Sequence, residues 1–336
     1  MTLLLTKLCD LKDGEEGDFF AQLTGKDELL TKNGKPYFRV TFRDAKREVA
    51  FPIWADSSFA GDCKEQWKRG AFFKIRALYR MTQFGPQLDL RRIRETNADD
   101  EAAGFDPADC LPRADLDGEA LFARLRGLVE AEVESPDLKA LCLHLLDEWR
   151  TPMLIAPAAA SNHHAYCCGY LEHVDSVVRN ARMIADKYLQ DGQPEASFRR
   201  ELVLAGALLH DIGKLLELRL DETDPGYTPA GELIGHVLLG RDMLRDAMRV
   251  CPLDDETALR LEHVIVSHQR LAEWGSPKPP MTLEALIVHF ADDLDAKYHM
   301  MHAALRDDEQ PGPMTGNRNS LRQRLFRGLN GVAQAE

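Results

Sequence analysis

Long apolar runs are missing from this chain of 336 residues, and so are the cysteine spacings typical of metal or redox motifs. No stretch approaches the roughly 20 apolar residues that a membrane-spanning helix needs, so we expect no membrane insertion. The seven cysteines form an odd set without CxxC spacing, which favours reduced thiols over a disulfide framework. The first residues lack the long apolar core and the small-residue cleavage site of a signal peptide. These absences together predict a cytoplasmic protein.

Positive charge is scarce overall, because 42 Lys and Arg stand against 55 Asp and Glu and the formal net charge is −13. An acidic chain argues against a nucleic-acid partner, since Lys and Arg neutralise phosphates in such complexes. The average conceals a local excess. Residues 19–94 carry 16 Lys and Arg against 8 Asp and Glu, a balance of +8. The pattern therefore indicates a basic module joined to an acidic body.

The basic module shows the alternation of short β-strands. Strands are expected at 37–43, 48–54, 71–80 and 87–93, with turn residues between them. Several short strands in a small domain fit a Greek-key barrel, and the OB fold is the commonest such barrel with a basic face. We therefore predict an OB-like nucleic-acid-binding β-barrel over residues 1–96.

Helical periodicity replaces the strand pattern after a linker at 97–117 that is rich in Asp, Ala and Pro. An all-α domain is predicted over 118–305, followed by a C-terminal tail at 306–336. Its helices are expected at 118–133, 135–149, 171–190, 198–218, 232–250, 255–268 and 282–305. The predicted fold class is thus multidomain α+β, a small β-barrel followed by an all-α helical bundle.

The strongest chemical signal is the segment GALLHDIGKLLEL at 206–218, which puts His210, Asp211 and Lys214 on an apolar helix. Desolvating three ionisable groups costs free energy, and a divalent cation held by imidazole and carboxylate is a sufficient compensation. A buried His and Asp pair that only stabilises the helix end is the alternative. Further candidates lie on other predicted apolar helices: His173, His236, His263, His268 and Asp292. Separate helices that each carry such a residue favour one shared metal site.

The order His, then His-Asp, then a distant Asp resembles the HD-domain phosphohydrolase superfamily. This resemblance implies that four residues bind a divalent metal inside the bundle, namely His173, His210, Asp211 and Asp292. Extra histidines hold a second metal in some HD branches, which implies the same for His236 and His268. His263 is as readily explained by a structural role.

Longer strings are similar to the YhaM family of 3′-to-5′ exoribonucleases over residues 19–300. They are HHAYCCGYLEHVDSV, LAGALLHDIGK, GELIGHVLLG, SHQRLAEWGSPKPPM and LEALIVHFADDLDAKY, with NGKPYFRVTFRDA in the β module. The resemblance implies hydrolysis of single-stranded RNA to nucleoside 5′-monophosphates. The chain departs from the family at Gln269, where a second His is usual, and at Cys167 and Cys168.

Within that chemistry, His210 and Asp211 are the expected catalytic centre, and Lys214 is a third candidate that could face the phosphate. A salt bridge between Lys214 and Asp211 is the competing explanation. Mixed imidazole and carboxylate ligands without thiolate suit one or two Mn²⁺ ions, with Mg²⁺, Co²⁺, Fe²⁺ and Ni²⁺ as alternatives.

The strand at 37–43 suggests how a polymer could bind. Alternation places Phe38, Val40 and Phe42 on the core face of this strand. The other face joins an aromatic ring to cations, as in sequence-tolerant single-strand binders, although a solvated charged face is the alternative. The candidate nucleic-acid-binding residues are Tyr37, Arg39, Arg43, Lys74 and Arg76, together with His163 and His164 ahead of the first metal helix.

Two other functions remain open at this point. One is an HD phosphohydrolase that acts on free or cyclic nucleotides, and the other is a non-catalytic RNA-binding protein. Single-stranded DNA is an alternative polymer substrate, and self-association into a homo-oligomer is compatible with the sequence.

Overall fold

The structure is a computed structural model that describes residues 5–31, 33–82, 85–110, 116–159, 166–192, 198–220, 226–308, 310 and 312–329. The chain divides into two compact units. The first comprises Met1–Arg113 with Asp221–Asp224, and the second comprises Ala114–Leu220 with Pro225–Glu336. His163 and His164 lie outside the described residues.

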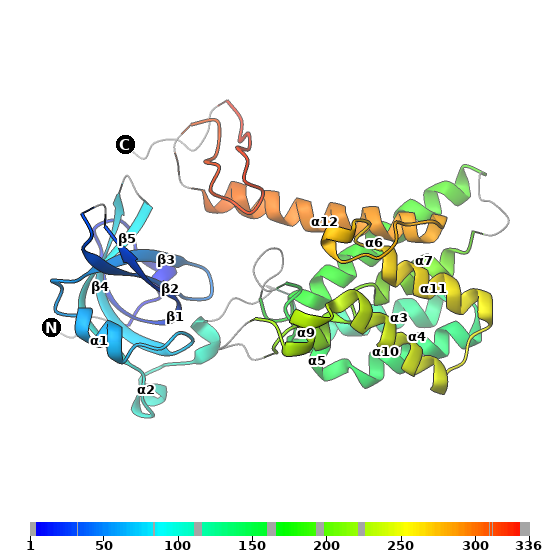
Figure 1. Cartoon of the computed structure of the whole chain (residues 1–336), viewed down its shortest axis with the longest axis horizontal. Helices are drawn as coiled ribbons and strands as arrows, with labels where there is room; N and C mark the ends of the chain where they lie inside the picture. The colour runs from blue at the N-terminus through cyan, green and yellow to red at the C-terminus, as the bar shows by residue number, and fades with distance from the viewer. Residues whose placement is uncertain are drawn as a thin grey trace. The chain divides into compact units, whose positions relative to one another are not determined.

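Five antiparallel strands make up most of the first unit (Figure 1). They are β1 (Glu16–Leu30), β2 (Pro36–Arg43), β3 (Glu48–Trp54), β4 (Phe72–Thr82) and β5 (Gly85–Glu95). The sheet order is β3-β2-β1-β4-β5, with α1 (Ala60–Glu65) between β3 and β4. β3 and β5, at the two ends of this order, also contact each other. The predicted small β-barrel is therefore confirmed.

The long strand β1, which the sequence did not predict, connects the two halves of the barrel. Its first part, Glu16–Gln22, pairs with β4, and the part from Gln22 to Leu30 pairs with β2. The register shifts between Leu23 and Gly25, where a bulge lets one strand bend between two partners. This bend brings Phe42 of β2 edge-on to Phe73 of β4, with ring centroids 5.5 Å apart in the core.

The segment predicted as a linker is partly folded against the first unit. It contains α2 (Asp99–Ala102) and the 3₁₀ helix η2 (Pro107–Cys110), and a further 3₁₀ helix, η1 (Leu8–Asp10), precedes β1. The buried carboxylate of Asp100 accepts hydrogen bonds from both terminal nitrogens of Arg94, at 2.6 and 2.7 Å. The residues after β5 therefore extend the first unit.

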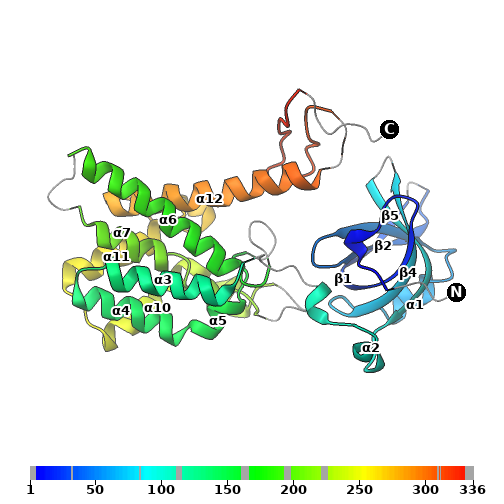
Figure 2. The same cartoon turned by 180° about the vertical axis from the view of Figure 1, so that it is seen from behind.

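The second unit is helical, as predicted (Figure 2). Its first helices are α3 (Gly118–Glu132), α4 (Pro136–Glu148), α5 (Arg150–Ile155), α6 (Gly169–Gln190), α7 (Arg200–Leu209) and α8 (Lys214–Glu217). They are followed by α9 (Pro229–Leu233), α10 (His236–Val250), α11 (Asp255–Ser267), η3 (Ala272–Trp274) and α12 (Leu283–Asp307). α6, α7 and α12 pack on one another, and α11 packs on α7 and α12. The multidomain α+β class is confirmed.

Two helices that the sequence predicts as continuous are broken, and both breaks lie beside the candidate site. The predicted helix 198–218 ends at Leu209 and restarts at Lys214. The predicted helix 232–250 is interrupted before His236 by Gly235, whose φ of +80° is a conformation that favours glycine. Each break redirects the chain, so that His210 and His236 can turn toward a common point.

The tail after α12 forms a small structure of its own. Met314 and Phe326 make an antiparallel bridge, and Arg327 donates to the backbone carbonyl of Asp308 at 2.6 Å. Among the described residues, no helix combines the length and the apolar character that crossing a bilayer requires.

Candidate metal centre

Six side chains from five separate places in the sequence converge in the second unit. Asp211 lies at the middle of the cluster: its Oδ2 is 3.4 Å from Nε2 of both His173 and His210. Its Oδ1 is 3.4 Å from Nε2 of His268 and 3.5 Å from Nε2 of His236. Asp292 completes the cluster, with Oδ1 at 3.2 Å from His173 and 3.7 Å from His210. All six residues that the sequence suggested as metal ligands are therefore brought together.

The positions of the six residues at helix ends and on packed helices explain how their side chains come together. His210 and Asp211 stand in the turn between α7 and α8, and His268 directly follows α11. His173 and Asp292 lie within α6 and α12, two helices that pack side by side. His236 opens α10.

A glycine makes the approach of α10 possible. A Cβ atom at Gly213 would lie 2.0 Å from the carbonyl oxygen of His236 and 2.4 Å from the amide nitrogen of Gly240. Any side chain at this position would therefore push the N-terminus of α10 away from the turn that carries His210 and Asp211.

The four imidazoles share one orientation, with Nδ1 turned outward to an acceptor and Nε2 turned into the cluster. Nδ1 of His210 lies 2.8 Å from the carbonyl oxygen of Ala207, and Nδ1 of His268 lies 2.7 Å from that of Ile265. A carbonyl can only accept, so Nδ1 carries the proton and Nε2 keeps a lone pair. This is the tautomer that binds a metal through Nε2.

Carboxylates orient the other two rings, and the sequence interpretation missed both. Asp295 Oδ2 lies 2.7 Å from Nδ1 of His173, and Glu217 Oε1 lies 3.0 Å from Nδ1 of His236. Glu217 Oε1 also accepts the backbone N–H of His236 at 2.9 Å. The spacing of Asp292 and Asp295, three positions apart on one helix face, was a usable signal for Asp295.

Charge in the cluster is concentrated and buried. Burial alone would raise the pKa of Asp211, but the Lys214 ammonium and the imidazole of His210 hold it well below 3.8. Burial lowers the pKa of His268, which favours the neutral ring. Lys214 Nζ lies 2.6 Å from Asp211 Oδ2, so the salt bridge considered from the sequence is present.

The donor set fits divalent cations. Two groups of donor atoms each lie within 4.8 Å of one another, one from His173, His210 and Asp292 and one from Asp211, His236 and His268. The Nε2 atoms of His210, His236 and His268 are buried and make no hydrogen bond to any residue that the structure describes. Burying polar atoms without partners is costly, and metal coordination would satisfy all three. Imidazoles and carboxylates without thiolate suit first-row divalent ions.

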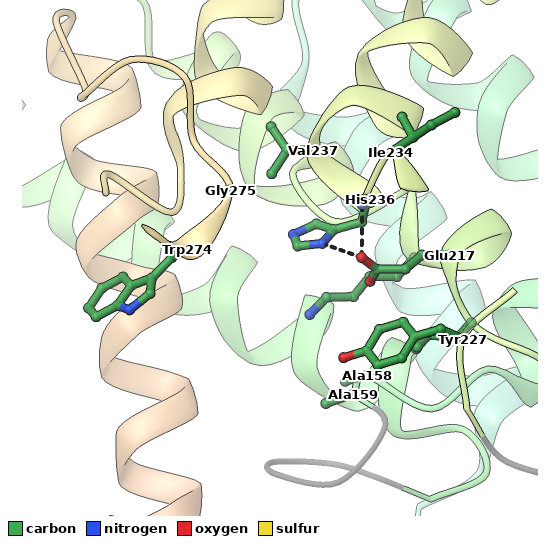
Figure 3. A pocket seen from close by; sticks show the side chains of 12 residues that line it. Ala158, Ala159, Glu217, Tyr227, Ile234, His236, Val237, Trp274 and Gly275 are labelled. Atoms are coloured by element: carbon green, nitrogen blue, oxygen red, sulfur yellow. Dashed lines mark hydrogen bonds and ion pairs between the residues drawn. The ribbon is translucent and has the colours of Figure 1, made fainter. Parts of the chain in front are cut away.

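A pocket of about 310 Å³ opens beside this cluster (Figure 3). Lys214 and His236 belong both to the cluster and to the pocket wall, and Glu217 also lines the pocket. Tyr227, which lies before α9, and Trp274, the last residue of η3, also line the pocket. The sequence interpretation did not single out either aromatic residue.

His263, the remaining histidine candidate, lies apart from the cluster contacts. Its Nε2 accepts the backbone N–H of Met281 at 2.8 Å. Burial lowers its pKa, which keeps the ring neutral and able to accept this bond. The structural explanation of His263 therefore agrees with its observed contact.

The candidate RNA-binding residues of the barrel differ in how strongly they are already engaged. Tyr37 pairs across strands with Trp54, with ring centroids 5.0 Å apart, and Arg39 is exposed on the same face. The other three contact nearby polar groups: Arg43 donates to Gln22 at 3.1 Å, Lys74 lies 3.4 Å from Asp100, and Arg76 donates to Asp18 at 2.7 Å. Of the predicted core face, Val40 and Phe42 are fully buried, whereas Phe38 is only partly buried.

Comparison with known proteins places the cluster in a family. Residues 170–297 match the HD domain family, so this part of the chain is an HD domain. HD domains form a superfamily of metal-dependent phosphohydrolases. His173, His210, Asp211, His236, His268 and Asp292 all lie within the matched residues.

Two solved structures of replication protein A from Methanococcus maripaludis are also similar to part of the chain. The solution structure of its second OB-fold domain is 15% identical, covers 28% of this chain and 95% of that chain, and has a TM-score of 0.22. The crystal structure of a domain of the same protein is 12% identical, covers 28% and 96%, and has a TM-score of 0.23.

Proposed function

We propose that the protein is a metal-dependent 3′-to-5′ exoribonuclease that removes nucleoside 5′-monophosphates from single-stranded RNA. The observation that carries the proposal is the convergence of four imidazoles on the two oxygens of Asp211, inside an HD domain. Each ring turns Nε2 toward Asp211 and Nδ1 toward an acceptor outside the cluster. The similarity to YhaM-type sequences supplies the direction of attack and the polymer substrate.

In this proposal, His173, His210 and Asp292 would hold one divalent cation and His236 and His268 a second, with Asp211 as a ligand shared by the two sets. Bound metal supplies a water of lowered pKa and positive charge for the phosphate oxygens. Mn²⁺ is the ion we favour. Asp295 and Glu217 keep the protons of His173 and His236 on Nδ1, so that Nε2 stays available.

Lys214 has a second role in the proposal. Its ammonium lines the pocket and contacts Asp211 Oδ2. The positive charge of this side chain therefore lies at the border between the cluster and the space where a substrate can enter. A fixed positive group stabilises the negative charge that develops on a phosphoryl group during displacement. Lys214 would therefore bind the scissile phosphate when the substrate is present.

The barrel is proposed to hold the RNA upstream of the cleaved end. Half-buried Tyr37 and exposed Trp54 form an aromatic pair beside Arg39, an arrangement that stacks bases and neutralises phosphate. The local charge balance of +8 favours a polyanion as the partner. Arg43, Lys74 and Arg76 would contribute mainly through this local charge, because each already contacts a polar neighbour.

Single-stranded RNA labelled at either end tests the proposal. With 5′-labelled RNA and Mn²⁺, we expect a ladder of progressively shorter products, and with 3′-labelled RNA we expect the labelled mononucleotide at the earliest time points. Chelation should abolish both. Release of a 5′-terminal nucleotide first, or equal hydrolysis in chelator, would contradict the proposal.

The size of the pocket favours one alternative, a phosphohydrolase acting on free nucleotides. A volume of about 310 Å³ is at the lower end of the range of small-molecule pockets, roughly 300–1,000 Å³, and suits one nucleotide. Under this alternative, a free or cyclic nucleotide is consumed while labelled RNA remains intact.

A further inference from the structure

We infer that the pocket beside His236 is a binding site for the base of one nucleotide, the 3′-terminal one, which Trp274 and Tyr227 stack. The inference rests on the proposed function, because it takes the cleaved polymer as the occupant. It adds a base-binding subsite to a centre whose other residues are proposed to bind metal or phosphate.

The position of the pocket is the first argument. Lys214 and His236 line it, and both also contact the carboxylate of Asp211, at 2.6 Å from Oδ2 and 3.5 Å from Oδ1 respectively. A phosphate at the cluster would therefore have the pocket directly beside it. In a chain attacked from its 3′ end, the group attached to that phosphate on the product side is a single nucleoside.

The size of the pocket and the character of its walls are the second argument. About 310 Å³ offers room for one nucleoside rather than several. Trp274 and Tyr227 are 48% and 44% exposed, although both are large aromatic residues beside a charged centre. Figure 3 shows the Tyr227 ring reaching toward the space beside His236, and Trp274 on the other side of the pocket with its indole extending away from His236 in this view. Exposed aromatic side chains at the rim of a pocket are what base stacking uses.

Both aromatic residues belong to segments whose backbone contacts residues next to the histidine and aspartate cluster. Tyr227 bridges to Leu218, and the neighbouring N–H of Thr228 donates to the carbonyl of Glu217 at 2.8 Å. Glu217 is the residue that orients His236. This backbone pairing holds Tyr227 at a fixed distance from Glu217 and His236. A substrate-binding ring needs such a fixed distance from the reacting phosphate.

The loop of Trp274 is fixed in a comparable way. Gly275 has a φ of +102°, and a Cβ built there would lie 3.8 Å from Val237, the residue after His236. Buried Ser276 accepts the backbone N–H of Gln269 through its hydroxyl at 3.1 Å, and Gln269 follows His268. The two aromatic residues are thus tied to the two histidines of the same proposed metal site.

Abasic substrates separate a base-binding pocket from a general effect. We expect Trp274→Ala to lower kcat/KM for terminal cleavage of an ordinary oligoribonucleotide roughly tenfold, within the range of about 5- to 150-fold that one stacked base contributes. On an oligonucleotide whose 3′-terminal residue lacks its base, Trp274→Ala and the wild-type protein should be equal. An abasic penultimate residue should leave the tenfold difference in place. Trp274→Phe should restore most of the activity, because a phenyl ring still stacks.

Tyr188→Ala is the matched control, since Tyr188 is also an aromatic residue with 46% exposure, but it lies near the far end of α6 from His173. It should match the wild-type protein on every substrate. If Trp274→Ala instead has the same effect on terminal-abasic and ordinary substrates, the pocket does not read the base and the inference is wrong.

A binding measurement makes the test independent of hydrolysis. The probe is an oligonucleotide that carries 2-aminopurine at its 3′ end behind a bridging-methylene phosphonate, a linkage that resists hydrolysis. Stacking on Trp274 should quench its fluorescence in the presence of Mn²⁺, and the quenching should be lost in Trp274→Ala with Tyr227→Ala. Unchanged quenching in this double variant would overturn the inference. Absence of RNA hydrolysis by the wild-type protein would instead overturn the proposed function, and the fluorescence result would stand on its own.

Discussion

Glu217 binds His236 twice, through the ring Nδ1 at 3.0 Å and through the backbone N–H at 2.9 Å, both on the same carboxylate oxygen. One acidic side chain therefore fixes both the position of the N-terminus of α10 and the tautomer of its first residue. Comparable control of His173 comes from Asp295, to which Ser176 also donates a hydrogen bond.

Glu217→Ala should weaken the metal site that contains His236 and leave the site of His173 largely intact. Loss of an orienting carboxylate typically lowers metal affinity about 10- to 100-fold. Titration of the metal-free protein with Mn²⁺ by calorimetry should then show one tight and one weakened site. Glu232→Ala, which removes an exposed carboxylate from nearby α9, is the control and should titrate like the wild-type protein. Equal weakening by both changes would show that Glu217 acts only through net charge.

Asp295→Asn should produce the opposite selectivity. Both oxygens of the Asp295 carboxylate accept hydrogen bonds, whereas asparagine has one oxygen that accepts and an NH₂ group that only donates. The hydrogen bond that fixes the tautomer of His173 is therefore lost or weakened, and the site with His210 and Asp292 weakens with it. Competition between Mn²⁺ and a chromophoric chelator measures the affinities of the two sites. If Asp295→Asn and Glu217→Ala weakened the same single site, the assignment of the six ligands to two sets would be wrong.

Lys214→Gln should separate phosphate binding from the salt bridge to Asp211. If Lys214 neutralises the scissile phosphate, kcat/KM for RNA falls about 100- to 1,000-fold, as for loss of other groups that stabilise transition-state charge, while metal stoichiometry is kept. If the salt bridge alone matters, the Tm of the protein falls and the activity per folded molecule is unchanged. Steady-state kinetics and thermal unfolding of the same preparation distinguish the two.

Gly213→Ala should destabilise the protein and reduce metal binding together. The new Cβ would meet the His236 carbonyl at 2.0 Å, a clash that backbone movement must relieve at a cost of about 1–3 kcal/mol or more. Gly127→Ala is the matched control, because that glycine is exposed within α3 with no atom near its Cβ position. It should raise the free energy of unfolding by about 0.5–1 kcal/mol. Urea unfolding measures both, and a neutral Gly213→Ala would show that α10 does not need this close approach.

The convergence of the six candidate ligands was predictable from the sequence because imidazoles and carboxylates are rare on strongly apolar helices. His210 sits in a run of buried residues, where only a metal or another charge compensates it. The orienting residues gave a weaker signal. Acidic residues such as Glu217 usually lie on solvated helix faces, so its inward position depends on the close packing of α8 and α10.

The missed elements have physical causes as well. β1 carries glycines at Gly17 and Gly25 and a bulge, which obscure its alternation, and its middle is buried on both faces. The break between α7 and α8 falls on His210–Gly213, where His, Asp and Gly are weaker helix formers than the Leu and Ala on either side, and the close approach of α10 at Gly213 adds to this local preference. Trp274, the last residue of η3, and Tyr227 are far apart in the sequence, so their place on one pocket wall depends on how the bundle packs.

Binding of manganese by the metal-free protein tests the central claim most directly. Equilibrium dialysis of wild-type protein and Asp211→Ala, both checked for a folded state by circular dichroism, gives the number of ions per chain. The account predicts two Mn²⁺ ions on the wild-type protein and loss of both tight sites in Asp211→Ala, because one carboxylate faces both ligand sets. No bound metal on the wild-type protein, or undiminished binding by Asp211→Ala, would contradict it.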